Sequence, residues 1–174
     1  MLTTKQEAAN EVDMLRETNV GSAGSGMKTS NLETLAGYQQ FVEALGDAVI
    51  ICDSDGLIRV WNAAAEHLFG FTPAEALGSS LDLIIPERLR ERHWAGYART
   101  MATGQTRYGH DVLRVPAMHK DGRTLSIAFT IGLLLGPQRR VTGLVAVIRD
   151  ETKRFAEERD LRKRLAELAR KHGA

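Results

Sequence analysis

The sequence offers little from which a cross-linked or membrane-spanning protein could be built. Cys52 is the only cysteine among 174 residues, so no disulfide can form within the chain. No apolar run approaches the roughly 20 residues that span a bilayer, and the first residues contain no apolar signal-peptide core. The charges nearly cancel, with 23 Lys and Arg against 22 Asp and Glu, which removes any general attraction to nucleic acid. We therefore expect a cytoplasmic protein that binds neither membranes nor nucleic acid.

Signatures of catalysis are also missing. The chain has no Gly-rich phosphate loop, no Gly-x-Ser-x-Gly sequence and no zinc-protease motif. Cys52 ends the apolar run of residues 49–52, a setting typical of a buried, inert thiol. His110 and His119 could in principle join another histidine at a metal, but no compact spacing such as His-x-x-x-His exists. We therefore expect that the protein is not an enzyme.

The length suits one domain with extensions at both ends. Residues 1–30 form an N-terminal extension that is flexible by composition, because positions 21–26 are Gly, Ser and Ala. Residues 31–46 are predicted to form a flanking helix, and residues 47–150 a central domain. Residues 151–174 are helical and charged, with Leu161, Leu165 and Leu168 spaced as in a short coiled-coil seam. This last segment is either a solvated helix or an output helix that pairs with a second subunit.

The central domain alternates between strand and helix patterns. Residues 48–53 and 57–61 flank an Asp-Gly turn and predict a β-hairpin. Two short helices are expected after Asn62 and Thr72, which can cap them. Three strands are expected later, in residues 107–118, 124–135 and 141–148, and Pro116 indicates that the first lies at an edge or carries a bulge. The fold class is therefore α+β.

One longer helix, residues 86–104, lies between these two sets of strands. Leu89, His93, Tyr97 and Met101 recur every four residues and therefore lie along one side of it. A single histidine thus stands within an apolar and aromatic row. The function depends on what this histidine contacts.

The order of these elements closely resembles that of a PAS domain. The similarity covers about residues 36–152 and includes residues 62–75, 53–56, 120–123 and 149–152. It implies a five-stranded antiparallel sheet with short helices on one face that enclose a small pocket, flanked by N- and C-terminal helices. It also implies a sensory or interaction role, with a homodimer and a signal that leaves through the terminal helix. Light-sensing members carry a reactive cysteine in the region that corresponds to residues 62–71, which has none here.

Within the family, the long helix resembles that of haem-binding oxygen sensors of the FixL type. Those helices read Arg-x-Arg-His with an aromatic residue four positions later, as Arg90, Arg92, His93 and Tyr97 do here. The resemblance implies haem b with His93 as the iron ligand. It places Arg99 and Arg107 where basic residues contact the propionates, and Phe129 and Ile131 on the sheet wall. The implied cofactor-binding residues are His93, Tyr97, Arg99, Met101, Arg107, Leu113, Phe129 and Ile131.

One departure from that subfamily affects which gas the haem would bind. The arginine that contacts the gas in those sensors corresponds to Leu113, with Arg114 one residue away. An apolar residue there disfavours oxygen relative to carbon monoxide, or leaves the iron to an internal sixth ligand, for which Tyr108, Met101 and Met118 are candidates.

The sequence therefore indicates three candidate functions. The first is a haem-based sensor of a diatomic gas or of redox state. The second is a PAS interaction module that dimerises through its terminal helices, and the third is a receptor for another small ligand. The downstream partner is not specified by these residues.

Overall fold

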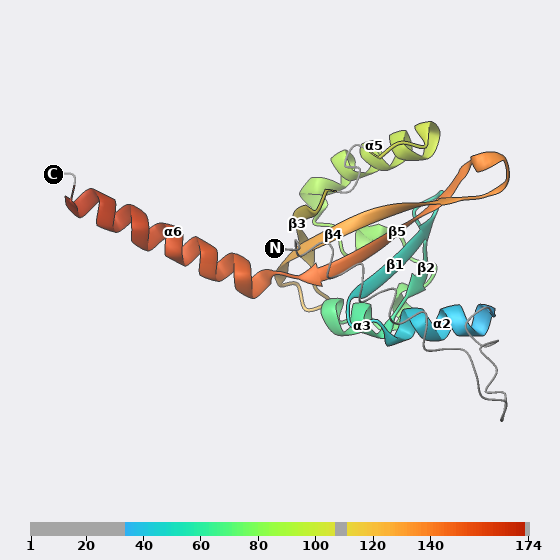
Figure 1. Ribbon diagram of the computed structural model, residues 1–174, viewed down its shortest axis with the longest axis horizontal. Coiled ribbons are helices and arrows are strands. Elements are labelled where there is room, and N and C mark those ends of the chain that lie inside the picture. The colour runs from blue at the N-terminus through green and yellow to red at the C-terminus, as the bar shows by residue number, and fades with distance from the viewer. Residues whose placement is uncertain (1–33, 107–110, 173–174) are drawn as a thin grey trace, which may run out of the picture.

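The computed structural model describes residues 34–106 and 111–172, and within them the chain forms one five-stranded sheet with helices (Figure 1). The sheet order is β2-β1-β5-β4-β3, and every neighbouring pair is antiparallel. The strands are β1 (Ala48–Asp53), β2 (Ile58–Trp61), β3 (Leu113–Met118), β4 (Thr124–Leu135) and β5 (Val141–Asp150). The predicted α+β class and five-stranded sheet are confirmed.

The strand predictions differ from the structure only at their ends. The first late strand begins at Leu113, and residues 107–110 of the predicted segment lie outside the described residues. Pro116 lies in β3, which is an edge strand as predicted, where a residue without an N–H is tolerated. β5 continues to Asp150, two residues beyond the predicted end.

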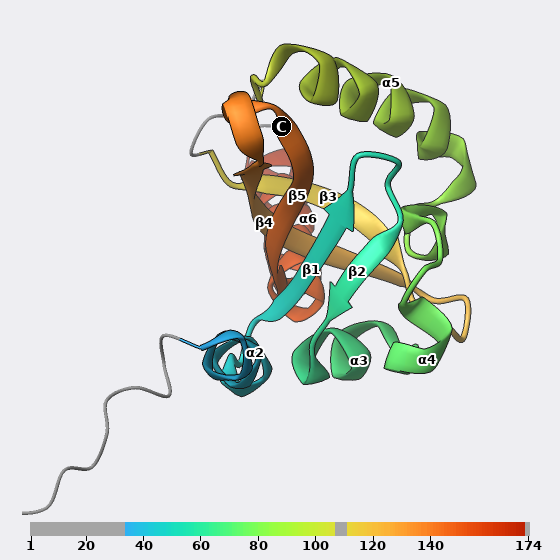
Figure 2. The same cartoon turned by 90° about the vertical axis from the view of Figure 1, so that its right-hand side faces the viewer.

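The helices precede, connect and follow the strands, and Figure 2 shows α4 and α5 on the same side of the sheet. They are α2 (Leu35–Ala44), α3 (Ala63–Phe69), α4 (Pro73–Ala76), the 3-10 helix η2 (Leu81–Leu83), α5 (Glu87–Thr103), the 3-10 helix η3 (Pro137–Arg139) and α6 (Thr152–His172). α5 begins one residue later than predicted, because Pro86 is its N-cap rather than its first residue. Gly104 ends it in the left-handed conformation, as expected.

Asn62 joins three elements of the fold. Its side-chain oxygen accepts from the main-chain N–H groups of Ala65 (3.0 Å) and Val49 (2.9 Å). Its amide nitrogen donates to the main-chain oxygens of Val42 and Asp47. The side chain is fully buried, and it therefore caps α3 while it links β1 to the end of α2.

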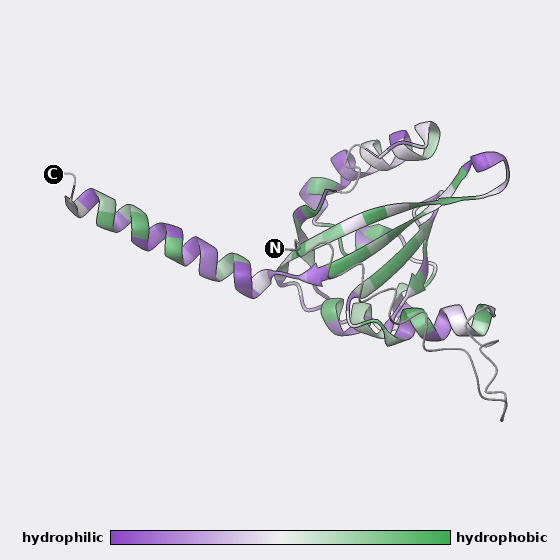
Figure 3. Ribbon diagram, viewed as in Figure 1, coloured by the Kyte–Doolittle hydropathy of each residue, from purple (hydrophilic) through white to green (hydrophobic). Residues whose placement is uncertain are grey.

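Alternating side chains on the strands form the core. Cross-strand pairs such as Ile50 with Ala146 and Phe129 with Ile148 place one apolar row on the face that α5 and η2 cover. Figure 3 shows the strands as largely hydrophobic, whereas α6 alternates between polar and apolar residues.

α6 projects away from the sheet, and its leucines Leu161, Leu165 and Leu168 are all exposed. Among the described residues, no helix combines the length and the apolar character needed to cross a membrane.

Candidate functional site

A cavity of about 120 Å³ lies between α5 and the inner face of the sheet. It is lined almost entirely by apolar side chains, to which His93, Tyr97 and Cys52 add the polar atoms. The sheet contributes Ile50, Cys52, Val115, Pro116, Ala117, Ile127, Phe129, Ile131, Leu144, Ala146 and Ile148. The helical side contributes Leu81, Ile84, Ile85, His93 and Tyr97.

His93 presents an unpaired nitrogen in this apolar setting. Its Nε2 atom is buried and has no hydrogen-bond partner, the only such side-chain atom among the residues that the structure describes. Burial lowers the pKa of His93 below its ordinary value of 6.5, and the carboxylate of Asp82 opposes this in part. The imidazole is therefore neutral at neutral pH. A neutral imidazole with an unpaired nitrogen is a competent metal ligand.

Tyr97 lies one turn further along α5 and is engaged elsewhere. Its hydroxyl donates to the main-chain oxygen of Asp53, at the end of β1. Burial raises its pKa, with a further contribution from the neighbouring Cys52. Tyr97 therefore stays protonated, and its hydroxyl anchors α5 to the β1–β2 turn.

Cys52 is a member of the cavity wall that the sequence analysis treated only as a buried thiol. Its side chain is 3% exposed, and burial raises its pKa to about 12. The thiol is therefore protonated and unreactive, as predicted. Nothing in the local sequence indicated that it faces a cavity, since that depends on the pairing of β1 with β5.

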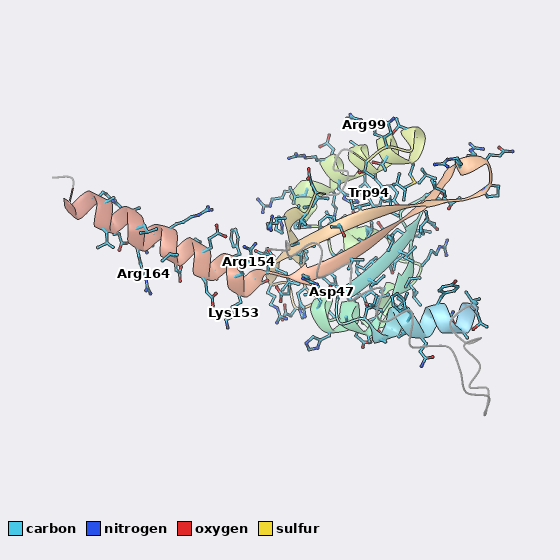
Figure 4. The ribbon with its side chains drawn as sticks, in the orientation of Figure 1. Asp47, Trp94, Arg99, Lys153, Arg154 and Arg164 are labelled. Atoms are coloured by element: carbon cyan, nitrogen blue, oxygen red, sulfur yellow. The ribbon has the colours of Figure 1, made fainter. Side chains whose placement is uncertain are left out.

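Four of the eight predicted site residues line the cavity: His93, Tyr97, Phe129 and Ile131. Met101 packs against the core from α5 but does not line the cavity. Arg99 is exposed on the outer side of α5, as Figure 4 shows, and lies outside the cavity. Arg107 and the candidate sixth ligand Tyr108 lie outside the described residues. The Nδ1 atom of His119 lies 2.9 Å from a carboxylate oxygen of Asp121, and His119 does not line the cavity.

Leu113 and Arg114 face opposite sides of the sheet. Leu113 pairs with Phe129, so both lie on the inner face beside the cavity. Arg114 points the other way, and its Nε atom lies 3.2 Å from a carboxylate oxygen of Glu151. Glu151 also pairs with Arg154 in the first turn of α6. Arg114 therefore does not serve the cavity; it connects β3 to the base of α6.

The residues just before α5 line the cavity, which the sequence analysis did not predict. Leu81, Ile84 and Ile85 close one side of the cavity. Their apolar pattern was a usable signal, because an apolar run that ends directly at a helix start is usually buried. Among the described residues, no group of three or more His, Cys, Asp or Glu side chains could hold a metal ion.

Comparisons with known proteins agree on the fold. Residues 36–150 match the family model described as PAS fold. The chain is 27% identical over 133 residues to the sensor protein FixL of Bradyrhizobium diazoefficiens, covering 76% of this chain and 26% of that protein. It is 31% identical over 134 residues to an uncharacterized protein of Azorhizobium caulinodans, covering 76% of this chain and 18% of that protein. The chain thus spans about a quarter or less of the length of these relatives.

Solved structures add the same fold at lower identity. The PAS domain of a Colwellia psychrerythraea protein is 22% identical with a TM-score of 0.59, covering 67% of this chain and 95% of that one. An RNA-binding light-oxygen-voltage receptor is 20% identical with a TM-score of 0.60, covering 88% of this chain and 42% of that one. At these identities the likeness extends to the fold alone.

Proposed function

This chain belongs to the PAS family, and on that premise we propose that it is a sensor domain that binds haem b through His93 and reports a diatomic gas or a redox state. The observation that carries this proposal is the buried, unpaired Nε2 atom of His93, a residue that lines an apolar cavity. A buried polar atom without a partner is costly, so it indicates a missing partner. The 27% identity to the FixL sensor protein supports the same assignment.

The residues present suit the group in chemistry. His93 would hold the iron, while the sheet wall of Ile50, Phe129, Ile131 and Ala146 would pack against the macrocycle. Bound haem would supply an iron site whose ligation and oxidation state respond to gases and redox conditions. The protein's own part is to keep the imidazole neutral and to exclude water from its unpaired nitrogen.

The wall opposite His93 bears on which gas is sensed. It is apolar apart from the Cys52 thiol, a weak hydrogen-bond donor, and Leu113 lies on the same face beside Phe129. Oxygen bound to haem is stabilised by hydrogen-bond donors much more than carbon monoxide is. We therefore propose that the site favours carbon monoxide over oxygen.

The cavity volume sets a condition on this proposal. At about 120 Å³ the cavity is smaller than typical ligand pockets of about 300–1,000 Å³, and a haem macrocycle needs more room. Entry of haem therefore requires α5 to move away from the sheet. Arg90 and Tyr97 hold the first two thirds of that helix by hydrogen bonds, so movement is expected beyond Tyr97, at its C-terminal end.

The same volume favours a second candidate. An apolar cavity of this size accommodates a small apolar molecule without rearrangement, as engineered cavities of about 150 Å³ bind benzene. Under this alternative the chain is a receptor for a small apolar ligand, and His93 either donates or accepts one hydrogen bond to it.

Under either candidate we propose that the output is non-enzymatic and passes through α6 to a second copy of this chain in the cytoplasm. Leu161, Leu165 and Leu168 follow d, a and d positions of a heptad and are exposed. A parallel pair of α6 helices in that register places Glu157 at a g position opposite Arg162 at the e position of the second copy. The complementary charges favour this pairing over an unpaired helix.

The test is an absorption measurement on the purified full chain titrated with haemin. We expect an intense Soret band at one equivalent, and its loss or a large shift in His93→Ala. Arg92→Ala, on the exposed neighbouring residue, is the matched control and should titrate like the native chain. A native chain that leaves haemin unbound would overturn the haem proposal, and a small molecule detected by mass spectrometry of the purified protein would then favour the second candidate.

A further inference from the structure

Three aromatic rings meet within one turn of α5. The ring centroids of His93 and Trp94 lie 5.0 Å apart, with the planes at 84°. Those of Trp94 and Tyr97 lie 5.4 Å apart at 65°, and those of His93 and Tyr97 5.9 Å apart at 37°. The imidazole is therefore contacted by an aromatic ring on two sides, with an edge-to-face contact to Trp94.

Trp94 is held in place by partners on two other elements. Its indole N–H donates to a carboxylate oxygen of Asp82 in η2, at 2.9 Å. Its six-membered ring lies directly on Gly56 of the β1–β2 turn, where a Cβ atom would overlap it. Figure 4 places Trp94 on the side of α5 that faces the sheet, opposite Arg99. The indole is thus fixed both by a hydrogen bond and by a close backbone contact.

Asp82 is itself fixed by Arg90. The Arg90 guanidinium donates to the main-chain oxygen of Asp82 at 3.0 Å, and its Nε atom lies 3.5 Å from the carboxylate. The main-chain N–H of Asp82 donates to the hydroxyl of Ser80 at 3.1 Å. The carboxylate therefore presents a defined acceptor to Trp94 rather than a freely rotating one.

An unpaired buried nitrogen needs such support. Left alone, the His93 ring gains by rotating until Nε2 finds a hydrogen-bond partner, because an unsatisfied buried polar atom is unfavourable. The contacts of Trp94 and Tyr97 with the ring oppose that rotation. Residues that orient a metal ligand in this way often decide affinity as strongly as the ligand itself.

We propose that Trp94, oriented by Asp82 and seated on Gly56, is the positioning residue that holds the His93 ring beside the cavity in the orientation that leaves Nε2 buried and unpaired. This inference rests on the proposed haem function, because the orientation of Nε2 matters most if His93 binds iron. The contacts that fix the His93 ring are present without haem. Trp94 does not contact the ligand; it acts through His93. The chemical class that it serves is a metal centre bound by imidazole.

The experiment uses one variant of Trp94, two variants of Asp82 and one matched control. Trp94→Phe keeps an aromatic ring but removes the N–H, and Asp82→Ala removes the acceptor, whereas Asp82→Asn keeps an oxygen acceptor. Trp61→Phe is the control, because Trp61 is a buried indole whose N–H also donates to one oxygen, that of Phe71 at 2.9 Å. A purely structural role of the indole would make both tryptophan variants behave alike.

The first readout needs no haem. NMR of ¹⁵N-histidine-labelled apoprotein reports the tautomer of His93. We expect one tautomer in the native chain and in Asp82→Asn and Trp61→Phe, but a mixture of tautomers in Trp94→Phe and Asp82→Ala. His93 signals that are identical in all five proteins would overturn the proposal. If Trp94→Phe does not fold, the pair Asp82→Ala and Asp82→Asn decides the question.

The second readout is the rate of haem loss to an excess of a haem-scavenging apoprotein. We expect loss at least tenfold faster in Trp94→Phe and Asp82→Ala, and within twofold of native in Trp61→Phe and Asp82→Asn. Equal rates in all variants would also contradict the positioning role. If the native chain binds no haem, the proposed function fails, while the NMR readout still decides whether Trp94 positions His93.

Discussion

The Tyr97 hydroxyl donates a hydrogen bond to the main-chain oxygen of Asp53, so the helix that carries His93 is tied directly to the turn between β1 and β2. The same turn supports Trp94 through Gly56. The position of His93 therefore depends on residues about forty positions earlier in the chain. The geometry of that turn is fixed by hydrogen bonds from the N–H groups of Asp55 and Leu57 to the Asp53 carboxylate.

Tyr97→Phe should loosen this connection. Removing one hydroxyl deletes one hydrogen bond, which typically contributes about 0.5–1.5 kcal/mol to stability. We expect the free energy of unfolding to fall by that amount, and the amides of α5 to exchange with deuterium faster. Tyr38→Phe, on the exposed face of α2, is the control. Unchanged exchange in α5 would show that the hydrogen bond does not restrain the helix.

His93→Leu should stabilise the protein in the absence of any ligand. The substitution replaces a buried nitrogen that lacks a partner with apolar atoms of similar size, and such a nitrogen costs about 1–3 kcal/mol. We expect a higher melting temperature together with the loss of haem binding. The exposed His67 offers a control, since His67→Leu should leave stability nearly unchanged. A destabilised His93→Leu would mean that the imidazole has a partner in solution.

Acidification should destabilise the native chain partly through His93. Its pKa in the folded state lies below 6.5 because of burial, so the unfolded state binds more protons once the pH falls below about 6.5. Stability should therefore decline from that pH downward until the folded-state pKa is reached, and then no further on account of this group. Denaturant unfolding at several pH values measures this, with His93→Leu as the reference. Parallel pH profiles for the two proteins would contradict the lowered pKa.

Ala146→Leu should fill part of the cavity. Ala146 lines it from β5, and cavity-filling substitutions commonly raise stability by about 0.5–2 kcal/mol. We expect higher stability and much weaker binding of haem or of a small apolar ligand. Val145→Leu adds bulk to the opposite face of the same strand and should leave binding unchanged. Ligand binding that survives in Ala146→Leu would place the ligand elsewhere.

Leu165→Glu should disrupt dimers formed through α6. A carboxylate at the middle of the exposed leucine row would be brought against its copy at an a position. We expect the mass measured by light scattering to fall from dimer to monomer, as it should after deletion of residues 151–174. Lys163→Glu, at an outward-facing position of the same helix, should leave the mass unchanged. If the native chain is a monomer, α6 is not a dimer contact.

The elements of the fold were largely predictable because their signals are local. Asn62 and Thr72 begin helices as their capping side chains predict, and Gly56 supplies the positive φ that the hairpin turn needs. β4 was predicted with both of its ends, since large apolar residues recur at every second position from Leu125 to Ile131 and turn residues stand on both sides, at 120–123 and 136–137. Pro86 was misplaced by one residue because a proline is acceptable at either position around a helix start.

The candidate site was only half predictable. The inward row of α5 follows from four-residue spacing, and it correctly brings His93 and Tyr97 to the cavity. The wall formed by Cys52, Leu144 and Ala146 depends on β1 pairing with β5, residues far apart in the chain. Such non-local pairing leaves no trace in a short sequence window. The link from Asp82 to Trp94 is of the same kind, because neither residue alone indicates a partner.

The ion pairs from Glu151 to Arg114 and Arg154 connect an edge strand of the cavity wall to the base of α6. With 21 residues, this helix is a rod about 30 Å long at 1.5 Å per residue. By simple leverage, a tilt of about 5° at its base moves its far end by roughly 3 Å, the rise of about two helical residues. A displacement of β3 that is small at the cavity is therefore amplified mechanically along the rod before it reaches whatever lies at the other end.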